Sequence, residues 1–297
     1  MIARRISFAL ALAWLAAAAA AAATAHDVAF WRAVARDRYT PPANTTAAAL
    51  ADELVGMLAS SDPEQRDDIA YSTLASWIYQ QKLLDAAALR PIVGRLLANL
   101  TRGVGERDAN TVFGRSFSAL VLSVVIARDN VDPVLDAASW RTIESAAFAY
   151  LSAEQDLRGY DPDTGWMHSA AHTADLLKFL ARSRYVDASG QRRYLDAIAT
   201  KLTSASIVFT HGEDERFARA VLSLVARPDF DAAQFGAWLQ RTKPGVPEHP
   251  TVAQLRAAQN WKNLLAKLEV LLSNEPQPSD AAVTARTAVR AALKPLF

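Results

Sequence analysis

Apolar residues recur every three or four positions along almost the whole chain, from Ala47 to Leu296. An α-helix has about 3.6 residues per turn, so this spacing places the apolar side chains on one face of a helix. Only 11 of the 297 residues are glycine, and segments with the alternating β-branched pattern of strands are hard to find. The sequence therefore predicts an all-α fold with no sheet larger than two short strands.

The apolar segments follow one another with short turns between them, and they predict about eleven helices. Successive helices joined by short turns favour a HEAT-like stack or an α/α helical-hairpin array. No consensus recurs at a fixed period, so the array is predicted from the pairing of helices alone. We expect residues 26–46 to form an N-terminal segment and linker, and residues 47–297 to form a single all-α domain.

The first 25 residues have the three parts of a secretory signal. A positive start at Arg4 and Arg5 is followed by an apolar run and by the small-residue sequence Ala-Thr-Ala, which ends at Ala25. Cleavage there gives a protein that begins at His26 and is exported to the periplasm or secreted. The alternative is an uncleaved membrane anchor, because the apolar run is nearly long enough to span a bilayer. The chain has no cysteine, which excludes a lipoprotein anchor and any disulfide.

The charges of the chain are nearly balanced, with 32 basic and 31 acidic residues. Removal of the signal takes away two arginines and no acid, and a formal charge of −1 remains. A neutral balance without a basic run argues against nucleic acid or an anionic membrane surface as the main partner. We expect a small-molecule, glycan or peptide ligand, and no membrane contact after signal cleavage.

The segment GWMHSAAHTADLLKFLARS carries His168 and His172 four residues apart, and Asp175 three residues further on. At 100° per residue these three side chains share one face of the predicted helix, which Phe179 and Arg182 extend. The leucines of the segment fall on the opposite side. We therefore expect the histidines and the aspartate to form an accessible polar face rather than part of the core.

A His-x3-His pair followed by a carboxylate can supply neutral imidazoles and an anionic oxygen to zinc or a similar divalent ion. The zincin signature also requires a glutamate after the first histidine, and Ser169 stands there. Three interpretations of His168, His172 and Asp175 stay open: a polar stripe at the surface or in a wet groove, a metal site, and a polar binding or acid-base site without metal.

Charged and aromatic residues closely precede this helix. Asp156, Arg158 and Tyr160 come before the turn DPDTG, and a short connection brings the ends of neighbouring helices to the same edge. A structural ion pair is the competing interpretation for Asp156 and Arg158. Asp161 and Asp163 favour an Asx turn and a helix N-cap over a catalytic pair, and Gly159 is expected to cap the preceding helix.

The later segment HGEDERFARAV contains His211, which could reach the His168 face from a following repeat if the array curves. The three acids after Gly212 equally suit the first turn of a helix, where negative charge complements the helix dipole. Arg115, inside an apolar helix, is either an anion clamp or a core-edge arginine paired with an acid.

Four segments together resemble a bacterial family classed as domain of unknown function 2785: RDDIAYSTLASWI, VFGRSFSALVLSVVIARD, DLRGYDPDTGWMHSAAHTADLL and HGEDERFARAV. The resemblance covers roughly Leu50 to Leu272, and the segment that contains His168 and His172 is its most specific part. It implies a helical fold and directs attention to these motifs. It implies no activity, substrate or catalytic residue.

Two functions remain open. The first is an exported helical-repeat module with a polar groove that binds a peptide, glycan or small ligand, formed by Asp156, Arg158, Tyr160, His168, His172, Asp175 and His211. The second is a metal-dependent hydrolase in which His168, His172 and Asp175 bind zinc and Asp156 is the general base for a metal-bound water. A P-loop, a dinucleotide-binding glycine motif and a Gly-x-Ser-x-Gly elbow are all missing from the sequence, so no catalytic residue is assigned.

Overall fold

The computed structural model describes residues 26–294, and the predicted signal peptide, residues 1–25, lies outside them. Within the described residues the chain forms twelve α-helices: α1 (Val28–Arg36), α2 (Ala47–Met57), α3 (Ser72–Ala75), α4 (Ala86–Thr101), α5 (Thr111–Val131), α6 (Ala137–Ala153), α7 (Ser169–Ala181), α8 (Ala188–Ser204), α9 (Glu213–Val225), α10 (Ala232–Thr242), α11 (Val252–Ser273) and α12 (Asp280–Leu293). Two π-helical stretches, η1 (Glu64–Tyr71) and η2 (Ser76–Gln80), flank α3 and continue its helix on both sides. The prediction of an all-α helical array is confirmed.

The only strands in residues 26–294 are two short ones, β1 (Tyr160–Asp161) and β2 (Gly165–Trp166). They pair antiparallel, with Tyr160 opposite Trp166. This hairpin occupies the connection between α6 and α7, so the predicted limit of two short strands is met.

Most helices begin at a short polar side chain that accepts a hydrogen bond from a backbone N–H of the first turn, which satisfies a group the helix itself cannot pair. Asp85 accepts from the N–H of Ala88 at 2.8 Å at the start of α4. Thr251 and Gln254 form a reciprocal capping box at the start of α11. Local sequence signals therefore mark most of the helix starts.

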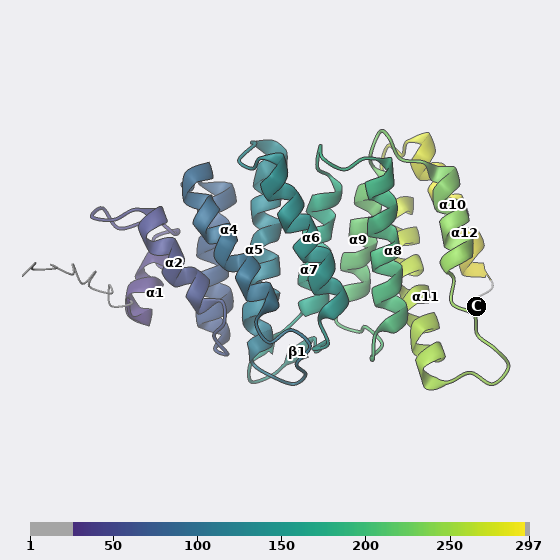
Figure 1. Cartoon of the computed structure of the whole chain (residues 1–297), viewed down its shortest axis with the longest axis horizontal. Helices are drawn as coiled ribbons and strands as arrows, with labels where there is room; N and C mark the ends of the chain where they lie inside the picture. The colour runs from purple at the N-terminus through teal and green to yellow at the C-terminus, as the bar shows by residue number, and fades with distance from the viewer. Residues whose placement is uncertain (1–25, 295–297) are drawn as a thin grey trace, which may run out of the picture.

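The helices stack in chain order along the long axis of the molecule, from α1 at one end to α10, α11 and α12 at the other (Figure 1). In one layer α5, α7, α9 and α11 pack closely side by side. In the second layer α4, α6 and α8 touch one another less closely and cover the first. We call these the close-packed layer and the open layer.

The first helix of the close-packed layer is α5, and 15 of its 21 residues are buried. By length and hydropathy alone this helix could cross a membrane, yet 83% of its apolar 18-residue stretch is buried inside the fold. Its neighbours α4 and α7 supply that cover. An apolar composition on all sides is what a helix enclosed by other helices requires.

The segment 26–46, expected as an N-terminal segment and linker, contains helix α1. Trp31 of this helix is fully buried, and its ring centre lies 6.4 Å from that of Trp77. The indole N–H of Trp77 donates to the carbonyl oxygen of Tyr39 at 2.6 Å. The segment therefore belongs to the hydrophobic core at this end of the array.

Candidate functional site

His172 lies in the first turn of α7 and is only 6% exposed. Its Nδ1 is 2.8 Å from Oγ of Ser116 on α5, and its ring meets the Phe117 ring edge-on at 4.8 Å between centres. The Ser116 hydroxyl also contacts the main-chain oxygen of Met167. A carbonyl oxygen can only accept, so the Ser116 hydroxyl donates to Met167, and Nδ1–H of His172 donates to Ser116.

His172 is therefore the neutral tautomer protonated on Nδ1, with a lone pair on Nε2. Burial lowers the pKa of His172 well below 6.5, and the nearby His168 and Arg216 lower this pKa further. The ring stays uncharged at neutral pH because a positive charge at this place would lose its hydration without gaining an acid.

His168 stands just before α7 and is 8% exposed. Its backbone adopts a left-handed conformation, with φ 48° and ψ 32°. The ring stacks on Trp166 with 4.2 Å between centres, and Nε2–H donates to the carbonyl oxygen of His211 at 2.9 Å. Burial lowers the pKa of His168 as well. His168 is thus the N-cap of α7 and lies outside its regular turns, so it does not have the helical geometry that the sequence predicts.

Asp175 is 3% exposed and joins α7 to α9. One carboxylate oxygen accepts from Nζ of Lys178 at 2.8 Å, and the other accepts from Nη1 of Arg216. Two cations on one buried carboxylate leave its oxygens fully engaged. This contact fixes the spacing of two helices in the close-packed layer.

The prediction that His168, His172 and Asp175 form an accessible face is wrong. Because α5 and α9 pack on both sides of α7, only a narrow arc of α7 reaches the surface. The open part of the predicted stripe lies one to two turns further on, at the half-buried Phe179 and the exposed Arg182.

The three predicted zinc ligands are not assembled as a metal site. In the part of the chain that the structure describes, no group of three or more His, Cys, Asp or Glu side chains could hold a metal ion. The Asp175 oxygens are held by Lys178 and Arg216, and Nε2 of His168 donates to a carbonyl. This donor set does not fit a divalent ion, so the geometry gives the zinc hydrolase no support.

Asp156 and Arg158 form the structural ion pair. Nε of Arg158 lies 2.9 Å from Oδ1 of Asp156 and Nη2 lies 2.6 Å from Oδ2, and Asp156 is buried. Nη2 also donates to the carbonyl oxygen of Ala109 at 3.2 Å, and the Ser169 hydroxyl donates to that of Asp156. These contacts anchor the connection into α7 and leave Asp156 no free oxygen to serve as a general base.

The hairpin confirms the Asx turn: Oδ1 of Asp161 accepts from the backbone N–H of Asp163 at 3.0 Å and of Thr164 at 2.9 Å. Tyr160 is exposed, and its ring centre lies 4.8 Å from that of Trp166. Tyr160 thus faces solvent beside Trp166, and its hydroxyl contacts none of the other predicted site residues. His168, and not Asp163, occupies the N-cap of α7.

His211 is brought beside His168, but through its main-chain oxygen, while its own ring is exposed. The ring packs closely against Gly159: a Cβ atom there would be 2.4 Å from Cγ of His211. Gly159 was expected to cap the preceding helix, but α6 ends at Ala153, and the glycine instead makes room for the imidazole. The acids after Gly212 lie in the first turn of α9, as predicted.

Arg115 is a buried core arginine. Its Nε lies 2.6 Å from Oε2 of Glu154, and Nη1 donates to the carbonyl oxygen of Arg102 at 3.0 Å. Lys201 donates to the carbonyl oxygen of Glu154 at 2.7 Å, and burial lowers the pKa of Lys201 to about 8. The alternative of a paired core-edge arginine is confirmed, and no part of this guanidinium is free to clamp a ligand.

Beyond Phe179 the polar stripe opens onto a cavity of about 580 Å³ at the ends of α5, α7 and α9. Nε–H of Arg182 donates to Oγ of Ser223 on α9 at 3.0 Å, and its guanidinium lies 5.2 Å from the centre of the Phe179 ring. The cavity is lined by Asn130, Arg182, Ser183, Arg184, Leu222, Ser223, Ala226, Arg227, Pro228 and Glu275.

The cations of this cavity differ in their partners. Arg184 lies 3.0 Å from a carboxylate oxygen of Asp129, and Arg227 lies 2.9 Å from one of Asp229. Arg182 pairs with no carboxylate among the described residues, and burial alone lowers the pKa of its guanidinium. The sequence placed Arg182 on the stripe but gave no sign of Ser223, which comes 41 residues later.

A family model described as Protein of unknown function (DUF2785) matches residues 100–272. The chain belongs to this family. The DUF2785 match runs from the last turn of α4 to the last turn of α11, and so contains the whole His168–Asp175 cluster and the Arg182 cavity except for its rim residue Glu275. No curated protein and no solved structure matches the chain.

Proposed function

We propose that this DUF2785 protein is an exported ligand-binding module. The Arg182 cavity, at the open end of the α7 stripe, receives an anionic group of a small molecule, glycan or peptide. The observation that carries the proposal is the guanidinium of Arg182, which opens onto the cavity and pairs with no carboxylate among the described residues.

An arginine that has lost part of its hydration gains most from a ligand that restores two hydrogen bonds at once. Nε of Arg182 is held by Ser223, while Nη1 and Nη2 donate to no other described residue. A carboxylate or phosphate can accept both N–H groups in a bidentate arrangement, which is stronger than a neutral hydrogen bond.

The walls of the cavity are fixed before any ligand arrives. The Ser223 hydroxyl donates to the carbonyl oxygen of Arg219 at 3.0 Å, so its oxygen is oriented toward Arg182. Asn130 donates from Nδ2 to the carbonyl oxygen of Phe179 at 2.9 Å. A preformed site costs less entropy on binding, and about 580 Å³ falls inside the usual range for small ligands.

The buried cluster has a positioning role in this proposal. His172 ties α7 to α5 through Ser116, and Asp175 ties α7 to α9 through Arg216. Arg182 is the C-cap of the same helix, less than one turn beyond Phe179, so its distance from Ser223 depends on these ties. The buried His172 and Asp175 thus support the Arg182 cavity without touching the ligand.

Titration calorimetry with citrate, inorganic phosphate and an oligoglutamate peptide tests this function. We expect the wild type to bind at least one of the three, and Arg182→Gln to bind it at least about tenfold more weakly, a loss near 1.4 kcal/mol. Arg36→Gln, the same change of charge at an exposed position of α1, is the control and should bind like the wild type. Failure of the wild type to bind any of these anions, or equal binding by Arg182→Gln, would contradict the proposal.

A further inference from the structure

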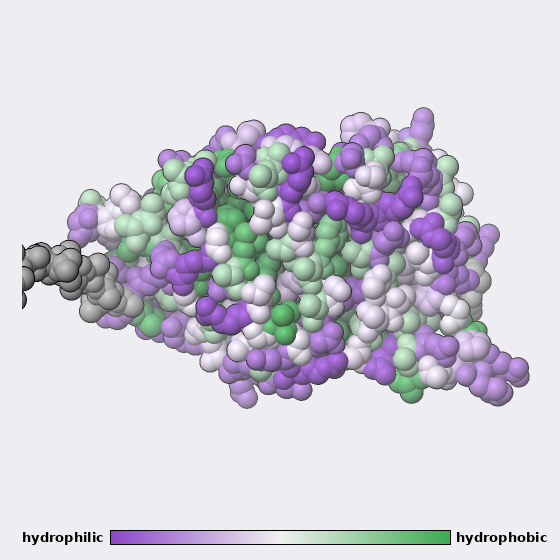
Figure 2. Space-filling model, in the orientation of Figure 1, coloured by the Kyte–Doolittle hydropathy of each residue, from purple (hydrophilic) through white to green (hydrophobic). Residues whose placement is uncertain are grey.

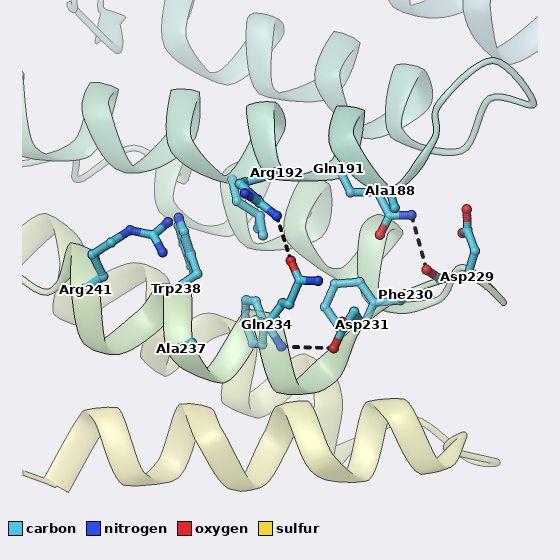
Figure 3. A pocket seen from close by; sticks show the side chains of 12 residues that line it. Ala188, Gln191, Arg192, Asp229, Phe230, Asp231, Gln234, Ala237, Trp238 and Arg241 are labelled. Carbon is cyan, nitrogen blue, oxygen red and sulfur yellow. Dashed lines mark hydrogen bonds between the residues drawn. The ribbon is translucent and has the colours of Figure 1, made fainter.

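A second cavity, of about 270 Å³, lies between α8 and α10 (Figure 3). The two helices form its opposite walls, and the residues around Asp229 close one end. In the orientation of Figure 2 this region is covered mainly by hydrophilic residues. The residues that carry the argument are Gln191, Arg192, Phe230, Gln234, Phe235 and Trp238.

Gln191 is a buried amide with one free end. It is 5% exposed, and its Nε2 points to the carbonyl oxygen of Asp229 at 3.5 Å. A carbonyl oxygen only accepts, so the nitrogen must face Asp229 and Oε1 must face the other way. Figure 3 shows that oxygen directed toward the space between the helices, and it accepts no hydrogen bond from a described residue.

Gln234 on the opposite wall offers the complementary group. Its Oε1 accepts from Nη2 of Arg192 at 2.8 Å. A guanidinium only donates, so the amide oxygen is fixed toward Arg192 and the amide nitrogen is left over. Nε2 of Gln234 donates to no described residue. The two glutamine amides therefore present one free acceptor from α8 and one free donor from α10.

The charges around the cavity are balanced. Asp231 accepts from the first-turn N–H groups of α10 at 3.0 and 2.9 Å. Asp229 pairs with Arg227, and Arg241 lies 3.6 Å from Asp196. With Arg192 the set has three cations and three anions, so no net charge selects a charged ligand.

The floor of the cavity is aromatic. Phe235 and Trp238 are buried and stacked, with 5.6 Å between ring centres, and Phe230 is half-buried beside them. Such a floor favours a methyl group or the apolar face of a ring. A small volume with one free amide donor, one free amide acceptor on the opposite wall and an apolar floor fits a single secondary amide that carries a methyl group.

We propose that this cavity binds the acetamido group of an N-acetylated sugar. The N–H of the acetamido group donates to Oε1 of Gln191, its carbonyl oxygen accepts from Nε2 of Gln234, and its methyl group lies on the aromatic floor. The remaining N–H groups of Arg192 and Oδ2 of Asp231 also line the cavity, where they can bond the hydroxyl groups of the sugar. The cavity holds one ring rather than an extended chain, which favours a sugar over a peptide backbone.

Saturation-transfer NMR and titration with N-acetylglucosamine, glucose and N-acetylalanine methylamide test this site. We expect N-acetylglucosamine to bind, glucose to bind at least tenfold more weakly, and the blocked amino acid to bind more weakly than the sugar. Gln234→Leu, at an exposed position that the fold does not need, should lower the affinity for N-acetylglucosamine at least tenfold. Gln191→Leu should do the same.

Gln259→Leu, at an exposed amide on α11, is the matched control and should bind N-acetylglucosamine like the wild type. Arg182→Gln should also leave this binding unchanged, which separates the site from the Arg182 cavity. Equal binding of glucose, stronger binding of the blocked amino acid, or unchanged binding by Gln234→Leu would overturn the proposal, as would the absence of binding by the wild type.

Discussion

The neutral state of His172 makes the stability of the protein depend on pH. The folded chain holds the pKa of His172 well below 6.5, whereas the unfolded chain takes up a proton near that value. Between these two pKa values the unfolded state binds more protons, so the free energy of unfolding falls as the pH falls below about 6.5. Above that pH the neutral ring of His172 makes its full contribution to the free energy of unfolding.

The size of the effect follows from linkage. One such histidine contributes a slope of about 1.4 kcal/mol per pH unit inside this window. The pKa of His168 is lowered in the same direction, so the two buried rings together contribute up to about 2.7 kcal/mol per pH unit. Ordinary carboxylates titrate closer to pH 4, so the interval between about pH 6.5 and 5 reports mainly the histidines.

His172→Phe removes the titrating group and keeps a ring of similar size against Phe117. Ser116 keeps its own acceptor on Met167, so the variant loses one hydrogen bond, worth about 1 kcal/mol, at pH 7.5. Below about pH 6.5 its unfolding free energy should fall with roughly half the slope of the wild type. At sufficiently low pH the variant becomes the more stable of the two.

Urea denaturation followed by circular dichroism, repeated between about pH 7.5 and 5, measures these slopes. Ser116→Ala is the control, because it removes the hydroxyl but keeps both histidines. It should be less stable by about 1–3 kcal/mol at every pH, with the slope of the wild type largely retained. If His172→Phe shows the full wild-type slope, His172 is not held neutral, and the burial argument is refuted.

Two further predictions concern the core and the N-terminus. Arg115→Met leaves Glu154 buried without its partner and should lower the free energy of unfolding by about 3–5 kcal/mol. The control is Arg32→Met, in an exposed pair with Glu64, which should leave the denaturation midpoint almost unchanged. Equal effects of the two substitutions would show that burial is not the cause. The exported protein should have the intact mass of a chain that starts at His26, and a mass that retains residues 1–25 would exclude signal cleavage.

The sequence by itself determined the features that depend on near neighbours. Helical periodicity gave the all-α class, because which residues share a face follows from 3.6 residues per turn alone. The Asp85 cap, the Asp161 turn and the ion pair of Asp156 with Arg158 were predictable for the same reason. In each of these contacts the partners are two or three residues apart.

The tertiary structure alone decided which parts of each helix are covered. The partner of His172 lies 56 residues away at Ser116, and the partner of Asp175 lies 41 residues away at Arg216. Periodicity predicts that two histidines and an aspartate share a helix face, but it does not predict how many neighbouring helices pack against that face. In this array two neighbours enclose α7, so its predicted polar face became an interior network, and only the end at Arg182 stayed open.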